Sequence, residues 1–145
     1  MDGSGLTVRN RDLARDYVQR AEARLQALDV LFGARSWADV VGESQEVVEL
    51  ALKGLLRACG VDPPHIHDVS EVLRAECDRL PVPLRAEVER LAAISHDLRR
   101  DRELAFYGAE DLTPSSFYSE RNATDARKGA QVTVRLVRPF VLGES

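Results

Sequence analysis

The sequence has little cysteine, no long apolar run and no apolar leader, and each shortage excludes a class of protein. Cys59 and Cys77 are the only cysteines, too few for a small scaffold built on disulfides, and without a secretion signal we expect reduced thiols. No apolar run approaches the roughly 20 residues that a membrane-spanning helix needs. The N-terminus, MDGSGLTVRNRD, lacks the apolar stretch of a signal peptide. The sequence therefore predicts a soluble, cytoplasmic protein.

Positive charge is not in excess. Lysine and arginine number 20 against 24 aspartates and glutamates, so the formal net charge is −4. This balance excludes a strongly basic nucleic-acid surface over the whole molecule, but not a local basic cleft, because binding depends on where the charges lie. Only Lys53 and Lys128 are lysines. This preference for arginine by itself identifies no activity.

What the chain does contain is the composition of one globular domain. Its 145 residues are enough to bury a proper core, and 44% hydrophobic with 30% charged residues is typical of folded proteins. No alternating pattern indicates a strand. We expect a flexible leader over residues 1–8, a single all-α domain over 9–142 and a tail over 143–145.

Apolar residues that recur every three or four positions predict the helices of the first half. The first helix begins after Asn10 or Asp12, and Gly33 closes it. The second begins behind Ser36, a candidate N-cap, and Gly60 ends it. Its apolar set is wide, as expected of a helix in the middle of a bundle.

The second half predicts three more helices. Asp68 caps a short third helix, the fourth covers about 84–107, and the fifth covers about 119–138, where Pro139 ends or kinks it. Because the connections are brief, the predicted fold is a five-helix, up-and-down antiparallel bundle.

Two stretches resemble a known family. Residues 37–73 read WADVVGESQEVVELALKGLLRACGVDPPHIHDVSEVL, which resembles the signature half of HEPN (higher eukaryotes and prokaryotes nucleotide-binding) domains. In that family a helix rich in E-x-x-x-x-A-L-K-x-L-L is followed by Gly, a Pro loop and His-Asp. Residues 98–108, LRRDRELAFYG, resemble the segment of the second family signature. Order, spacing and loop lengths agree from about Asp12 to Leu142.

This resemblance implies a HEPN-like helical bundle that pairs as a homodimer. Many members of the family are endoribonucleases, including toxins encoded beside a small nucleotidyltransferase antitoxin. Other members have lost the catalytic residues and serve in binding or assembly. We therefore expect a homodimer whose further partner is RNA, a nucleotide or a nucleotidyltransferase, with no cofactor.

The catalytic signature of the family is incomplete in this chain. Active members carry R-x(4–6)-H, often extended to R-x4-H-x-Y in the toxins. On that pattern Arg100 takes the Arg position and Tyr107 the Tyr position, while Ala105 stands where His is expected. Alanine cannot move the proton of a ribose 2′-hydroxyl, and the loss of a general acid or base typically lowers the rate by about 10²–10⁴-fold. Ala105 favours a binding or assembly module.

Helical spacing indicates a second interpretation. One polar side of the fourth helix carries residues at spacings of four, three and four: His96, Arg100, Glu103 and Tyr107. Ala105 and Arg102 fall on the apolar side. We hypothesise that His96 supplies the missing imidazole, so that the alternative function is a metal-independent endoribonuclease using Arg100 with His96 or Tyr107. An ordinary solvated helix face has the same composition, and this reading stays open.

Supporting residues are expected on two helices. Arg102, on the apolar line, needs either apolar surface along its stem or a buried acidic partner. Glu46 and Glu49 of the second helix are candidates to orient Arg100 or Arg102. Glu49 also precedes Lys53 by four residues, the favourable orientation for an ion pair within a helix.

Two further matches are weak. Arg90 and His96 read R-x5-H, but they lie about 120° apart around a helix, and the segment is out of register with the resemblance. His65 and His67 form H-x-H, yet two ligands are too few for zinc, and no third ligand has convincing spacing. The sequence therefore predicts no metal site.

Overall fold

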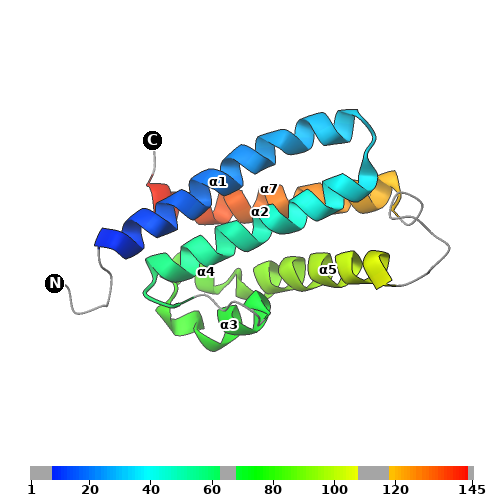
Figure 1. Ribbon diagram of the computed structural model, residues 1–145. Helices are drawn as coiled ribbons and strands as arrows, with labels where there is room; N and C mark the ends of the chain where they lie inside the picture. The colour runs from blue at the N-terminus through cyan, green and yellow to red at the C-terminus, as the bar shows by residue number, and fades with distance from the viewer. Residues whose placement is uncertain (1–7, 63–67, 108–117, 144–145) are drawn as a thin grey trace.

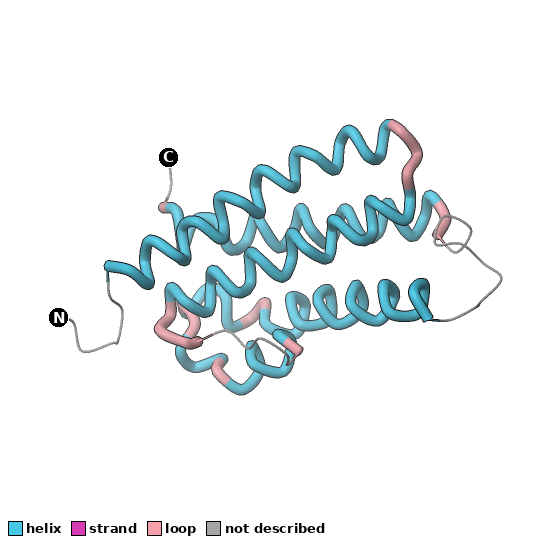
Figure 2. The backbone as a smooth tube through the Cα atoms, in the orientation of Figure 1, coloured by secondary structure: helices cyan, strands magenta, loops and turns pink. Residues whose placement is uncertain are grey.

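The computed structural model is a bundle of helices (Figure 1). It describes residues 8–62, 68–107 and 118–143, with side chains for 10–62, 68–101 and 118–143. The elements are α1 (Val8–Gly33), α2 (Trp37–Ala58), α3 (Val69–Ala75), the 3₁₀ helix η1 (Cys77–Arg79), α4 (Val82–Arg85), α5 (Val88–Tyr107) and α7 (Glu120–Leu142). Within the described ranges there is no strand (Figure 2), which confirms the predicted all-α class.

The four long helices run alternately in opposite directions (Figure 1), as predicted for an up-and-down bundle. Helix α2 is central, since it packs against α1, α7, α5 and α3. Its apolar residues explain this position, because they are buried on more than one side: Val40, Val41, Val47, Val48, Ala51, Leu52, Leu55 and Leu56. A helix with so wide an apolar surface is stable only when neighbours cover most of it.

Helix α5 lies on α3 and α2 and meets α7 over a shorter stretch. It buries Leu91, Ser95 and Leu98 and leaves its opposite side outside the bundle. Near its C-terminal end the Tyr118 hydroxyl donates a hydrogen bond to the Asp101 carbonyl oxygen at 2.7 Å, which joins the segment before α7 to α5. The outer side of α5 therefore presents polar side chains away from the core.

The structure corrects the predicted fourth helix, which is split. Leu84 lies in α4, and α5 begins only at Val88. Both side chains are buried, so the apolar spacing continues across the break and does not reveal it. The guanidinium of Arg85 donates to the carbonyl oxygens of Leu80 and Asp78. These bonds tie the end of α4 back to η1 and to the residue that follows it.

Two helix ends also differ from the expected ones. Helix α1 begins at Val8, ahead of the predicted Asn10 or Asp12. Helix α7 continues past Pro139 to Leu142, so its expected end near residue 138 is wrong. Proline removes only one N–H group, and Arg15 of α1 donates to the carbonyl oxygens of Val141 and Leu142 at the helix end. This contact satisfies carbonyls that a helix end leaves without partners.

The three predicted N-cap residues each precede a helix as expected, but only two of them cap it through the side chain. Ser119 makes a capping box with Asn122, and Asp68 accepts a hydrogen bond from the Ser70 N–H group. Ser36 occupies the N-cap position of α2 without a side-chain cap bond, because its hydroxyl donates to the Asp39 carboxylate instead.

Among the described helices, none combines the length and the apolar character needed to cross a membrane.

Candidate functional site

His96 and Arg100 lie one turn apart on the outer side of α5, as the spacing predicts. Their side chains are 57% and 56% exposed. Leu91, Ser95 and Leu98 are buried on the opposite side. The predicted division of this helix into an apolar and a polar side is therefore confirmed over its described side chains.

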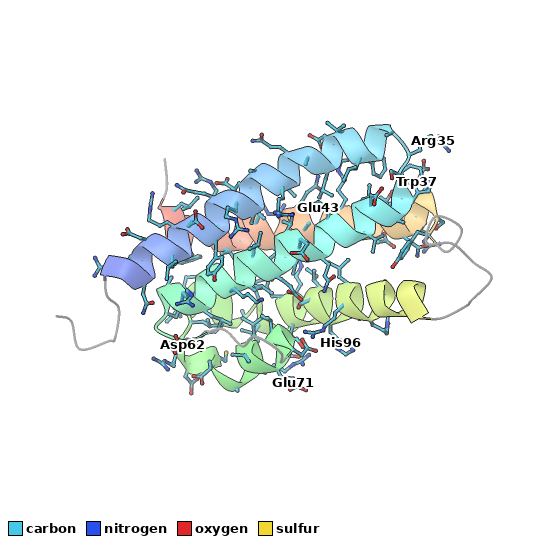
Figure 3. The ribbon with its side chains drawn as sticks, in the orientation of Figure 1. Arg35, Trp37, Glu43, Asp62, Glu71 and His96 are labelled. Carbon is cyan, nitrogen blue, oxygen red and sulfur yellow. The ribbon has the colours of Figure 1, made fainter. Side chains whose placement is uncertain are left out.

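The partner of His96 is Asp68, which lies 28 residues earlier in the chain. The Oδ2 atom of Asp68 is 3.3 Å from Nδ1 of His96, while its Oδ1 atom accepts the Ser70 N–H group at 2.9 Å. Figure 3 shows His96 on the side of α5 where α3 lies. The residue that caps α3 thus also binds the imidazole on α5.

Asp68 is held in its anionic form. Partial burial alone would raise the pKa of its carboxyl group, but hydrogen bonds from Ser70 and from His96, with the charge of the imidazole, outweigh this effect and lower the pKa below the usual 3.8. Hydrogen bonds donated to a carboxylate favour its charged form. At neutral pH, His96 therefore faces a negative charge at Nδ1.

Two arginines complete a small hollow beside this pair. Its lining consists of Asp68, His96, Arg99 and Arg100, and we call it the His96 hollow. With the described side chains, Arg100 makes long ion pairs, at 3.8 Å to Asp97 and 3.5 Å to Asp101. Exposed pairs of this kind contribute about 0–1 kcal/mol, so the guanidinium can exchange them for a bidentate bond to a phosphate.

Sequence reasoning missed half of this hollow. Asp68 was expected only to cap a helix, and Arg99 was not singled out. Arg99 follows His96 by three residues, a spacing that indicates one helix face, so it could have been found. The contact between Asp68 and His96 depends on the packing of α3 against α5, and no local pattern encodes it.

Several expected site residues cannot be placed. Arg102, Glu103 and Tyr107 belong to α5, but their side chains lie outside the described residues, as does that of Ala105. His65 and His67 also fall outside. The part assigned to these residues remains a prediction.

Glu49 has partners within its own helix, α2. Glu49 lies 3.7 Å from the Lys53 ammonium group and accepts a hydrogen bond from Gln45, which confirms the predicted Glu49–Lys53 pair. Among the described side chains, Arg100 pairs with two residues of its own helix, Asp97 and Asp101. An orienting role of Glu46 or Glu49 toward Arg102 involves a side chain beyond the described set, so it stays a prediction.

Arg90 is useful as a comparison with Arg100. It is 52% exposed on the same helix and lies 3.5 Å from Glu87, three residues earlier, much as Arg100 pairs with Asp97. It does not line the His96 hollow.

Among the described side chains, no group of three or more His, Cys, Asp or Glu could hold a metal ion. The hollow instead offers cationic donors for an anion.

Comparison with known proteins gives one positive finding. The family model described as the HEPN domain matches residues 14–139, a range that contains α2, α3 and most of α7 as well as the His96 hollow. No curated protein and no solved structure matches the chain. Because the match covers most of the 145 residues, the chain belongs to the HEPN domain family.

Proposed function

We propose that this HEPN-domain protein is a binding module that holds a phosphate group of a nucleotide or of single-stranded RNA in the His96 hollow. One observation carries the proposal, namely that Arg99, Arg100 and His96 line the same small hollow. Guanidinium groups match phosphate with two parallel hydrogen bonds. Family membership supports a role that involves nucleotides or RNA.

The charges around the hollow limit its reach along a nucleic acid. Asp97 and Asp101 flank Arg100, and the chain as a whole has a net charge of −4. A long duplex would meet repulsion beyond the hollow. A nucleotide or a short single strand fits this charge pattern better.

The test compares two arginines of one helix. Fluorescence anisotropy with a short labelled RNA is measured for the wild type, Arg100→Ala and Arg90→Ala. Hydrogen bonds to charged groups contribute about 1.5–3 kcal/mol, so Arg100→Ala should weaken binding by roughly tenfold or more. Arg90→Ala removes an equally exposed charge outside the hollow and should leave binding unchanged. Equal losses in both variants would contradict the proposal, and melting curves show whether either variant is misfolded.

A second candidate function is a metal-independent endoribonuclease, which the Asp68–His96 pair favours. In this reaction the neutral imidazole of His96 takes the proton of a ribose 2′-hydroxyl, and the 2′-oxygen attacks the adjacent phosphorus. The bond to the 5′-oxygen breaks, and this oxygen leaves with a proton from solvent. The products are a 2′,3′-cyclic phosphate and a 5′-hydroxyl. Arg100 stabilises the charge on the phosphoryl oxygens.

Incubation of a mixed RNA in EDTA separates the two candidates. Cleavage by the wild type that is lost in both His96→Ala and Arg100→Ala supports the nuclease, in spite of Ala105. If His96→Ala still cleaves RNA, His96 is not the general base. No cleavage by the wild type leaves the binding module.

The proposal includes the partners that the family resemblance implies. We propose a homodimer and, as a partner protein, a small nucleotidyltransferase in a toxin–antitoxin pair. Light scattering on the purified protein measures its mass and so tests the homodimer. If expression of the protein arrests growth and a neighbouring gene relieves the arrest, the toxin–antitoxin pair is supported. Unaffected growth would count against a toxin.

A further inference from the structure

Asp68 makes more contacts than a helix cap requires. A cap needs one side-chain oxygen that accepts a backbone N–H group, and Oδ1 does this for Ser70. The other oxygen lies 3.3 Å from Nδ1 of His96. Because Oδ1 is bound at the start of α3, the second oxygen, Oδ2, is held next to His96 of α5.

This contact decides which ring nitrogen of His96 carries the proton. An ionised carboxylate only accepts hydrogen bonds, and a neutral imidazole has one donor nitrogen and one acceptor nitrogen. Nδ1 must therefore be the donor, and Nε2 is left with its lone pair. The partner of one ring nitrogen sets the state of the other, and the same logic orders a carboxylate, an imidazole and a substrate hydroxyl in hydrolases.

We propose that Asp68 is a positioning residue, which holds His96 in the Nδ1–H tautomer so that Nε2 can take a proton from a ligand hydroxyl. The inference rests on the second candidate function, in which His96 is the base. The depressed pKa of Asp68 supports it, because the carboxylate stays ionised wherever the imidazole is neutral.

Two substitutions separate positioning from capping. Asparagine and serine are both good N-caps, so Asp68→Asn and Asp68→Ser should keep α3 and the fold. In Asp68→Asn the amide oxygen caps Ser70, which leaves the amide NH₂ to donate to Nδ1 of His96 and to force the Nε2–H tautomer. The serine side chain is too short to reach His96, and the ring is free to adopt either tautomer.

The first measurement is the tautomer itself, read from ¹⁵N chemical shifts of the imidazole at pH 8, where imidazoles are ordinarily neutral. The chain has three histidines, and a His96→Asn spectrum assigns the signal. The proposal expects Nδ1–H in the wild type and Nε2–H in Asp68→Asn. An Nε2–H wild type, or an unchanged tautomer in Asp68→Asn, would overturn it.

The second measurement is RNA cleavage in EDTA. Asp68→Asn should lower kcat by about 10²–10⁴-fold, the loss typical of a missing general base, with little change in KM because the arginines remain. Asp68→Ser should be the faster variant of the two. Asp68→Asn at least as fast as Asp68→Ser would reduce Asp68 to a cap and overturn the proposal.

The two measurements fail separately. If the wild type has the Nδ1–H tautomer, Asp68→Asn has the other tautomer and the wild type cleaves no RNA, then Asp68 positions His96 but the protein is not a ribonuclease. A wild type that cleaves RNA with the Nε2–H tautomer would retain the ribonuclease and reject the positioning. Melting curves of both variants establish that they fold.

Discussion

At the scale of single residues, Asp68 uses one oxygen, Oδ1, to cap α3 and the other, Oδ2, to contact His96 on α5. A cap of this kind typically contributes about 1 kcal/mol. Both contacts are stronger with the anion, so protonation of one carboxyl group weakens the start of α3 and its link to α5 together.

This dual role predicts how stability depends on pH. The pKa of Asp68 is lower in the folded protein than its usual 3.8, so the unfolded state binds the proton more readily. The stabilisation is fully present well above pH 3.8 and is lost as the pH falls through this value and then through the folded pKa. Asp68→Asn, which does not ionise, should lack this part of the acid destabilisation.

Urea unfolding of the wild type and Asp68→Asn between pH 7 and pH 3 measures this effect. The difference in the free energy of unfolding, wild type minus variant, should be largest near neutral pH and decrease as the pH falls. A difference that stays constant over this range would show that ionised Asp68 does not stabilise the fold.

At the scale of elements, α1 and α2 approach each other closely at Gly54. A Cβ atom added at Gly54 would lie 2.7 Å from Cγ2 of Val18 and 3.0 Å from the backbone oxygen of Ala14. Backbone cannot move aside as a side-chain tip can. A Cβ atom added at Gly42, in the same helix, would meet nothing within 4 Å.

These two glycines predict opposite effects of the same substitution. Gly54→Ala should destabilise the protein by about 1–3 kcal/mol, the usual effect of overpacking. Gly42→Ala should stabilise it by about 0.5–1 kcal/mol, because alanine loses less backbone entropy in a helix. Chemical denaturation of both variants tests the packing of α1 on α2. A Gly54→Ala variant as stable as Gly42→Ala would show that the helices are not in such close contact.

The elements were largely predictable because their information is local. Apolar spacing and the caps at Asp68 and Ser119 place the helices within the chain. The break between α4 and α5 was not predictable, since Leu84 and Val88 preserve the spacing across it. For the site, the shared face of His96 and Arg100 follows from helical geometry, but the contact with Asp68 arises only when α3 packs on α5.

At the scale of the whole molecule, charge separates a small anion site from a general nucleic-acid surface. The net charge is −4, and the cationic donors of the proposed site belong to one hollow. Phosphate contacts release counterions, and each contact with a single strand contributes about −0.7 to the slope of log K against log salt concentration. Two arginine contacts therefore predict a slope of about −1.4.

Binding of a short single-stranded RNA at increasing KCl concentrations measures this slope. Arg100→Ala should reduce its magnitude by about 0.7, because one phosphate contact is lost, and Arg90→Ala should leave it unchanged. A much steeper slope for the wild type would require many phosphate contacts, which the hollow of one chain does not offer. A dimer would present two such hollows. A slope of twice the predicted magnitude, which returns to the single value when the dimer is diluted into monomers, would therefore show that both copies bind the same strand.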